Sequence, residues 1–372
     1  MMLVFIAPRR YVQGRGVLRE AGALLKPLGK RPLLLWDSRV KAAIGPTLLD
    51  GLKEAGLVAA ETEFAGQSTK AEAARVAAIA RGHQADMIVG IGGGKALDTA
   101  KAAAFQAGIK IVTVPTIAST DSPTSSYTVW YGEGGDCLGF ESWGVNPDLV
   151  LVDTAVIAAA PVRSFVAGMG DALSTWIEAD ACRKARKGNL AGGGGQATLL
   201  AMAAARLCYD TVLTHGQEAM RAVERHVVTP AVEKVIEANV LLSGMGFENG
   251  GVATAHMVAN CLPSLPECRG LMHGEEVAFG IAVQMCLDED FDVAEMHRVI
   301  DFEIAVGLPV SFADIGLESP TRERLRAIAE ICGSRGSLCE NHPFRVTSED
   351  VMDALFAADA LGRARKSALG RK

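Results

Sequence analysis

The sequence predicts an α/β protein in which an N-terminal parallel β-sheet, covered by helices, is followed by an all-α C-terminal region. Short aliphatic runs alternate with helical patterns over the first 155 residues, which is typical of a parallel sheet with crossover helices. Beyond Pro161, Ala, Leu, Met and Glu dominate, and apolar positions recur at helical spacing. The chain has 372 residues, 49% of them hydrophobic, so it can bury two separate cores. We therefore expect two domains, at residues 1–160 and 161–372.

The individual elements follow from periodicity. Four runs of aliphatic or β-branched residues predict strands at residues 32–36, 87–90, 111–114 and 149–153. Apolar residues at helical spacing predict helices between them at residues 45–57, 71–81 and 96–107. Residues 126–131, followed by Gly132, Gly134 and Gly135, predict one arm of an inserted β-hairpin. The second region predicts helices at residues 167–185, 196–214, 232–242, 252–262, 275–287 and 348–361.

Composition excludes two classes of partner. Charged residues make up 22% of the chain and the formal net charge is −6, so no excess of Lys and Arg is available to bind a nucleic-acid backbone. The apolar run at residues 1–7 is short and no basic residues precede it, unlike a signal peptide. Later apolar stretches, such as residues 197–208, contain Arg206 and fall short of the roughly 20 residues that a membrane span needs. We expect a cytoplasmic protein that binds neither nucleic acid nor membrane.

A glycine-rich segment, GIGGGK at residues 90–95, joins a predicted strand directly to a predicted helix. Glycines let a backbone approach an anion closely, and the amides and dipole of the helix start attract phosphate. Lys95 adds a positive charge, but it occupies the third glycine position of the dinucleotide fingerprint, and Val89 and Ala96 do not fit a P-loop. The residues alone therefore predict a phosphate or dinucleotide site, with a tight strand-to-helix turn as the alternative.

Two further segments lie where ligands bind in parallel sheets. Asp37 follows the strand at residues 32–36, where a carboxylate can bind an adenine ribose and repel a 2′-phosphate, which favours NAD over NADP. Residues 114–126, which follow the predicted strand at residues 111–114, carry several hydroxyl groups and Asp121. The alternative for both segments is local turn formation by Asp, Ser and Thr side chains.

Two histidines stand in unusual contexts. His256 lies in a helix of small residues, so another element can come close to it. His273 precedes Gly274 and Glu275 at a predicted helix start, where the dipole keeps imidazole neutral, as a metal ligand must be. Asp171 begins an apolar helix and could equally be a helix-start carboxylate. Separations of 85 and 17 residues between these three match no local zinc pattern.

Five motifs spread over residues 11–362 are similar to those of bacterial glycerol dehydrogenases, the zinc-dependent branch of the iron-containing alcohol dehydrogenase superfamily. They are GIGGGKALDTAK at residues 90–101, PTIASTD at 115–121, NPD at 146–148, GDALST at 170–175 and HGEEVAF at 273–279. The resemblance implies that Asp171, His256 and His273 bind one Zn²⁺ per subunit. Iron-using members place a further His at the position of Thr175, so three ligands leave a coordination position open for a glycerol hydroxyl.

The resemblance also implies the remaining site. Asp121 is expected beside the substrate, and Asp121 and His256 are the expected catalytic residues. The expected NAD-binding residues are Asp37, Gly92, Gly93, Gly94, Lys95, Ala96, Leu97, Asp98, Thr116, Ile117, Ala118, Ser119, Ser125, Tyr127 and Tyr131. Two of them depart from the family: Ala96 stands where relatives usually have Thr, and Tyr127 where they commonly have an aliphatic residue.

The implied activity is NAD-dependent oxidation of glycerol to dihydroxyacetone, by hydride transfer from a zinc-bound secondary alkoxide to NAD in a homo-oligomer. A lyase or polyol-phosphate dehydrogenase of the same superfamily is the nearest alternative, and it would need Lys or Arg to bind a phosphate or carboxylate. A non-catalytic NAD-binding oligomer is the alternative from another class. The sequence contains no Gly-x-Ser-x-Gly motif, which argues against a serine hydrolase.

Overall fold

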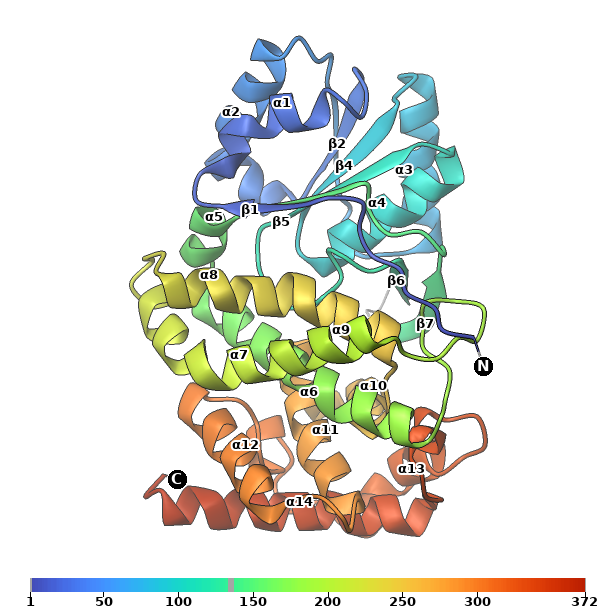
Figure 1. Ribbon diagram of the computed structural model, residues 1–372, viewed down its shortest axis with the longest axis vertical. Helices are drawn as coiled ribbons and strands as arrows, with labels where there is room; N and C mark the ends of the chain where they lie inside the picture. The colour runs from blue at the N-terminus through green and yellow to red at the C-terminus, as the bar shows by residue number, and fades with distance from the viewer. Residues whose placement is uncertain (1, 133–136, 372) are drawn as a thin grey trace. The chain divides into compact units, whose positions relative to one another are not determined.

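The computed structural model describes residues 2–132 and 137–371, and six parallel strands form the sheet of its N-terminal part (Figure 1). The strands are β1 (Tyr11–Gly14), β2 (Pro32–Trp36), β3 (Ala60–Glu63), β4 (Met87–Gly92), β5 (Lys110–Pro115) and β8 (Leu149–Asp153). Their order is β1-β8-β5-β4-β2-β3, and every pairing is parallel. The predicted parallel sheet is confirmed. The strands β1 and β3 were not predicted, because neither contains a run of aliphatic residues.

Helices cover both faces of this sheet because the side chains of each strand alternate between faces. On one face Leu34 and Trp36 pack with η1 (Val17–Glu20), α1 (Ala21–Leu25) and α2 (Ser38–Glu54). On the other face Leu33 and Leu35 pack with α3 (Lys70–Gly82) and α4 (Gly94–Ala107). Figure 1 shows α2 and α3 on opposite sides of β2 and β4. All five residues of β2 are consequently buried, which explains its continuous apolar run.

Two segments next to the sheet refine the predicted elements. The helix predicted at residues 45–57 begins earlier, at Ser38, because the Asp37 carboxylate accepts the backbone N–H of Arg39 and so starts the helix. The predicted hairpin is present as β6 (Tyr127–Tyr131) and β7 (Cys137–Ser142), which pair antiparallel. Gly134 and Gly135 lie outside the described residues. The hairpin is therefore inserted in the chain between two strands of the sheet, β5 and β8.

From residue 154 onward the described chain is helical, as predicted, and its one bridge joins Gln196 to Leu3. The longer helices are α5 (Thr154–Ala159), α6 (Val162–Lys184), α7 (Leu199–Val223), α8 (Pro230–Glu237), α9 (Ser243–Gly250), α10 (Thr254–Cys261), α11 (His273–Leu287), α12 (Val293–Val306), α13 (Arg322–Cys332) and α14 (Ser348–Ala368). A π-helical turn, η2 (Ala238–Leu242), links α8 to α9, and short 3₁₀ turns are η3 (Leu262–Ser264), η4 (Pro266–Gly270), η5 (Ala313–Ile315) and η6 (Leu338–Asn341). Within the described part of the chain, the helices lack the combination of length and hydropathy that crossing a bilayer requires.

The chain forms two compact units. The sheet unit contains residues 6–165 and 221–244, and the helical unit contains residues 2–5, 166–220 and 245–371. Residues 221–244, which the sequence assigns to the second domain, thus pack within the sheet unit. A single domain boundary after residue 160 stays a prediction. Within the sheet unit, α8 contacts Thr154, which follows β8, and η2 contacts Ala118 in the loop that follows β5.

Candidate nucleotide and metal sites

The glycine loop forms the turn between β4 and α4. Gly92 has a φ of +155°, and a Cβ there would lie 2.8 Å from the Cβ of Asp37 and 3.0 Å from that of Ala96. Only glycine fits this position without strain. Gly93 is the N-cap of α4 and supplies no side-chain cap to the amides of the first turn. Backbone N–H groups at such a helix start suit a phosphate ligand.

Lys95 is held over the hairpin by two neighbours in the sheet unit. Its Nζ donates to Gln67 Oε1 at 2.8 Å and lies 4.2 Å from the ring centre of Tyr131. Burial lowers the pKa of Lys95. Gln67 was missed in the sequence because no motif surrounds it. The cation is therefore oriented beside the glycine loop by side chains from two other segments.

Asp37 combines the two roles that the sequence left open. It caps α2, and the Arg39 guanidinium binds it at 2.9 Å from Nε to Oδ1 and 2.5 Å from Nη2 to Oδ2. The hydrogen bonds from Arg39 lower the pKa of Asp37 and outweigh its burial. Because Gly92 packs against its Cβ, Asp37 also lies next to the glycine loop. The carboxylate is thus ionised at the edge of the predicted nucleotide site.

The loop after β5 packs against the glycine loop. The Thr116 N–H donates to the carbonyl of Gly92 at 3.0 Å, and Ile117 lies 3.0 Å from where a Cβ of Gly93 would be. The Ala118 carbonyl accepts a hydrogen bond from Asn239. Leu97, Ser119 and Ser125 are buried in the same unit, and Tyr127 and Tyr131 begin and end β6. The predicted NAD residues therefore cluster at the carboxyl ends of β2, β4 and β5 and on the adjoining hairpin.

Asp98 is fully engaged by the surrounding protein. One carboxylate oxygen accepts from the Ser122 hydroxyl at 2.6 Å and pairs with Lys101 at 2.9 Å, while the other accepts the Val129 N–H at 2.9 Å. Lys101 also donates to the carbonyls of Ser122 and Ser125. Both members of this pair are buried. Asp98 thus ties α4 to the loop and hairpin that carry Asp121 and Ser125.

The π-helical turn η2 and the start of α9 hold the loop of Asp121. The Ser243 hydroxyl lies 3.3 Å from Asp121 Oδ2, and the Thr124 hydroxyl donates to the Val240 carbonyl at 2.9 Å. Asn239, on the same turn, donates to the Ala118 carbonyl at 3.1 Å. π-helical turns are frequent at functional sites. The apolar spacing of the sequence predicts an ordinary helix at residues 232–242 and does not distinguish this turn from it. Asn239, Val240 and Ser243 were therefore missed as supporting residues, whereas Thr124 belongs to the predicted segment at residues 114–126.

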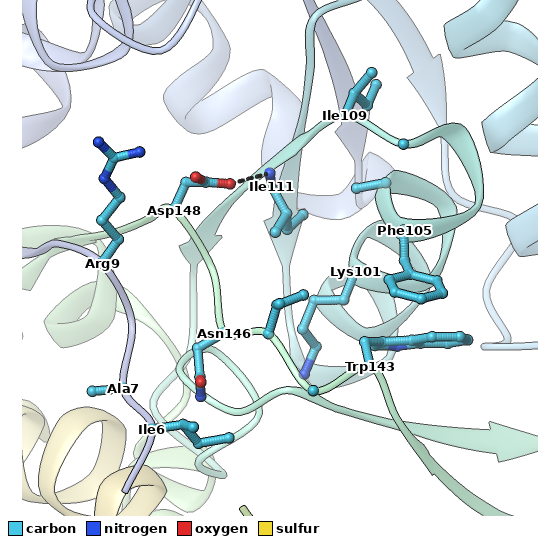
Figure 2. A pocket seen from close by; sticks show the side chains of 14 residues that line it. Ile6, Ala7, Arg9, Lys101, Phe105, Ile109, Ile111, Trp143, Asn146 and Asp148 are labelled. Atoms are coloured by element: carbon cyan, nitrogen blue, oxygen red, sulfur yellow. Dashed lines mark hydrogen bonds between the residues drawn. The ribbon is translucent and has the colours of Figure 1, made fainter. Parts of the chain in front are cut away.

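A cavity of about 610 Å³ on the sheet unit is lined in part by Lys101, the partner of Asp98 (Figure 2). The rings of Phe105 and Trp143 line it with centroids 4.7 Å apart. Asp148, in the NPD motif, accepts the Ile111 N–H at 3.0 Å there, as the dashed line in Figure 2 marks. The cavity contains none of the residues predicted to bind NAD or metal. In this structure the NPD motif ties the chain before β8 to β5.

The three predicted metal ligands meet in the helical unit. His256 Nε2 and His273 Nε2 lie 3.5 Å and 3.6 Å from Asp171 Oδ1, and one ligand atom from each residue lies within 4.8 Å of the others. Among the described residues, no further group of three His, Cys, Asp or Glu residues meets this distance. The side chains of Asp171, His256 and His273 are 2%, 12% and 35% exposed. The group is therefore closed around Asp171 and open on the side of His273.

Glycines bring the three ligand-bearing helices together. A Cβ on Gly274 would lie 1.7 Å from the Ala167 carbonyl oxygen, so α11 crosses α6 backbone to backbone beside His273 and Asp171. A Cβ on Gly280 would lie 2.3 Å from the Ala255 carbonyl oxygen, so α11 is equally close to α10 beside His256. The expectation that small residues around His256 admit a close neighbour is confirmed. Side chains from distant segments reach one point because the helix axes approach this closely.

The electrostatics of the group favour a cation. Burial lowers the pKa of His256, but the charges and hydrogen bonds of Glu178 and Asp171 outweigh burial and raise this pKa well above its ordinary value. Burial also lowers the pKa of His273, whereas Glu276 and Asp171 raise it, and the net shift is upward. The same negative charges that stabilise protons on these rings also attract a metal cation, which would bind in place of a proton. Two imidazole nitrogens and a carboxylate oxygen are donors that zinc accepts.

Thr175 occupies the position one helical turn after Asp171. Its side chain is buried, and a Cβ on Gly246 would lie 2.2 Å from its methyl group, so α9 packs closely against it. A larger side chain at this position would displace α9. The structure therefore brings together the three predicted ligands, with a packed Thr at the fourth position.

Known proteins resemble the chain over almost its whole length. The family model for iron-containing alcohol dehydrogenases matches residues 8–154. A glycerol dehydrogenase of Escherichia coli O6:H1 is 43% identical over 357 residues, 96% of each chain. A glycolaldehyde reductase of Halobacterium salinarum is also 43% identical, over 98% of this chain and 99% of its own.

A solved structure gives the same result. The crystal structure of a probable glycerol dehydrogenase from Sinorhizobium meliloti 1021 superposes with a TM-score of 0.91 at 41% identity, covering 98% of this chain and all of the other. The similarity thus extends over the fold and over nearly the full length of the sequence. The chain belongs to the iron-containing alcohol dehydrogenase family of oxidoreductases.

Proposed function

We propose that this chain oxidises glycerol to dihydroxyacetone with NAD as hydride acceptor, using one zinc ion held by Asp171, His256 and His273. The observation that carries the proposal is the group of one carboxylate and two imidazoles within 4.8 Å of one another. Its support is the 43% identity, over nearly the full length, to a protein named glycerol dehydrogenase. Three protein ligands with one position left for substrate is the pattern of catalytic zinc.

The metal and the chain have separate tasks. When bound, zinc supplies a Lewis acid that lowers the pKa of a secondary hydroxyl of glycerol. The His273 side, which is the more exposed, is where a small polyol can approach the ligand group. Asp121, held by Ser243, offers a carboxylate acceptor for a glycerol hydroxyl. The glycine loop and Lys95 bind the pyrophosphate, and the hydride chemistry belongs to NAD.

The proposed preference for NAD rests on Asp37. A carboxylate at this place binds ribose hydroxyls and repels a 2′-phosphate. Arg39 binds the same carboxylate with a side chain that is 83% exposed, so a cation is also at hand. The ratio of kcat/KM for NAD to that for NADP tests the choice, and a ratio below one would reverse it.

The central experiment follows NADH absorbance with glycerol before and after a chelator, and then after zinc is added back. We expect activity to disappear with the metal and to return with zinc. Activity that survives complete metal removal, shown by elemental analysis, would refute the zinc mechanism. The Asp171→Asn variant should lose activity in the same assay. Asp180→Asn is its matched control, because Asp180 lies on the same helix as Asp171 but pairs with Arg183 and Lys184.

Reduction of a small aldehyde is the second candidate, because the glycolaldehyde reductase of Halobacterium salinarum is equally similar. The two activities are compared by kcat/KM for glycerol oxidation and glycolaldehyde reduction on one preparation. The higher value identifies the substrate class. We further propose a homo-oligomer, which sedimentation of the purified chain tests.

A further inference from the structure

Glu178 lies on the same face of α6 as Asp171. The two residues are seven positions apart, about two helical turns, so their side chains project in the same direction. The Glu178 side chain is only 1% exposed. A buried carboxylate needs hydrogen-bond donors around it, because its desolvation is costly. Those donors come from α10.

The carboxylate of Glu178 binds the beginning of α10 at three points. Its Oε1 accepts the backbone N–H of Ala253 at 2.7 Å and that of His256 at 3.0 Å. Its Oε2 lies 2.5 Å from Nδ1 of the His256 ring. Ala253 is the N-cap of α10 and has no side-chain cap of its own. Glu178 therefore caps this helix from a distance and contacts the imidazole with its second oxygen.

The contact to Nδ1 selects one form of the ring. A carboxylate offers only acceptors, so Nδ1 must carry the proton and donate. The neutral ring then has its lone pair on Nε2, and Nε2 is the atom that lies 3.5 Å from Asp171 Oδ1. The opposite tautomer would place a proton where a metal ion has to bind. The ring is thus fixed in both rotation and tautomer.

We propose that Glu178 is a positioning residue of the metal site, whose carboxylate holds His256 in the one orientation and tautomer that presents Nε2 to a metal ion. This inference rests on the zinc site of the proposed function. The second ring nitrogen of a metal-binding His is commonly held in this way, and the partner raises the basicity of the ligand. Glu178 also adds a negative charge to that of Asp171, and together they balance a divalent cation.

The other histidine provides an internal comparison. Glu276 Oε2 lies 3.8 Å from Nδ1 of His273, beyond hydrogen-bond distance. Both glutamates are buried and each neighbours one imidazole. They differ in that only Glu178 makes the close contact. Glu276→Gln therefore measures the loss of a nearby charge. Glu178→Gln also removes the charge, and it leaves one acceptor oxygen, which cannot serve both the α10 amides and His256 Nδ1.

The test measures the zinc dissociation constant by competition with a chromophoric chelator, without NAD or substrate. We expect Glu178→Gln to weaken zinc binding by about 10- to 100-fold and Glu276→Gln by less. Gln284→Ala controls for helix capping, because Gln284 accepts the Ala255 N–H on the same turn of α10, as Glu178 accepts that of Ala253. A loss of zinc affinity in Gln284→Ala equal to that in Glu178→Gln would overturn the proposal.

Two further measurements keep the outcome decisive. If Asp171→Asn loses zinc and Glu178→Gln keeps it, the zinc site stands and only the role of Glu178 fails. If both keep it, the ligand assignment itself fails. If Glu178→Gln does not fold, ¹⁵N shifts of the His256 ring in the zinc-loaded native protein decide. A protonated Nδ1 and a metal-bound Nε2 are expected, and the reverse assignment would overturn the proposal.

Discussion

In the sheet unit, the residues from Gly92 to Asp98 are consecutive and lie in one strand-to-helix turn. In the helical unit, Asp171, His256 and His273 come from three helices that meet at close glycine contacts. The first group offers backbone amides and Lys95, which suit an anion, and the second offers two imidazoles beside two buried carboxylates, which suit a cation. An anion site made by a helix start is local by nature, whereas a cation site needs side chains that only tertiary packing can bring together.

Asp171→Asn is expected to have the largest effect, and it acts on the helical unit alone. Loss of the charged ligand should weaken zinc binding by more than about 100-fold and abolish NADH production, because even indirect partners of a metal contribute about 10- to 100-fold. The zinc constant is measured with a competing chelator and the NAD constant by fluorescence titration. If NAD binding falls as far as zinc binding, the two groups are not independent and the comparison breaks.

Asp98→Ala should have the largest effect within the sheet unit. Removing Asp98 takes away the counter-charge of the buried Lys101, which should lower the free energy of unfolding by about 3–5 kcal/mol. Lys41→Ala is the control, since Lys41 and Glu61 form an exposed pair in the same unit and should contribute less than about 1 kcal/mol. Denaturant unfolding measures both. Equal losses would show that the Asp98 pair does not hold the loop to α4.

Glu303 extends the comparison to a carboxyl of the helical unit that is fully buried. Neither of its oxygens has a hydrogen-bond partner among the described residues, and burial raises its pKa well above the ordinary value. The folded state therefore holds a proton that the unfolded chain releases above about pH 4.3. The contribution of Glu303 to stability is greatest below that pH and falls, by up to about 1.4 kcal/mol per pH unit, as the pH rises toward the raised folded pKa.

The Glu303→Gln variant should remove that slope. Its gain in unfolding free energy over the native protein is expected to be larger at pH 8 than at pH 5, measured in denaturant at both values. A gain that is equal at the two pH values would show that Glu303 does not titrate between them. The same comparison leaves the zinc ligands untouched.

Lys95→Met is expected to have the smallest effect, because most of the anion site is backbone. It should weaken NAD binding by about tenfold, as expected for one charge-assisted contact, and the loss should shrink at high salt. Lys70→Met is the matched control, since Lys70 lies 6.0 Å from the Trp130 ring of the same hairpin and is not among the residues expected to bind NAD. Unchanged NAD affinity in Lys95→Met would remove the lysine from the site.

Much of this was predictable because its causes are local. The four strong strands have continuous aliphatic runs, and the start of α11 at His273 follows from the residues that flank it. The helices α12 and α13 were missed, although each is amphipathic and capped by Asp292 or Thr321. Glu178 was also within reach, since its spacing of seven from Asp171 puts both on one helical face. Asn239 was not, because it lies on a π-helical turn, which has no sequence period to reveal it.

The sequence alone determined the glycine loop after β4, since strand, turn and helix start are adjacent in the chain and their backbone geometry depends on near neighbours. It also determined the class of fold, through hydrophobic periodicity. Only the tertiary structure decided that Asp171, His256 and His273 share one point, because this requires the axes of α6, α10 and α11 to cross at Gly274 and Gly280. Contacts between residues far apart in sequence depend on how helices pack, and packing is set by the whole core.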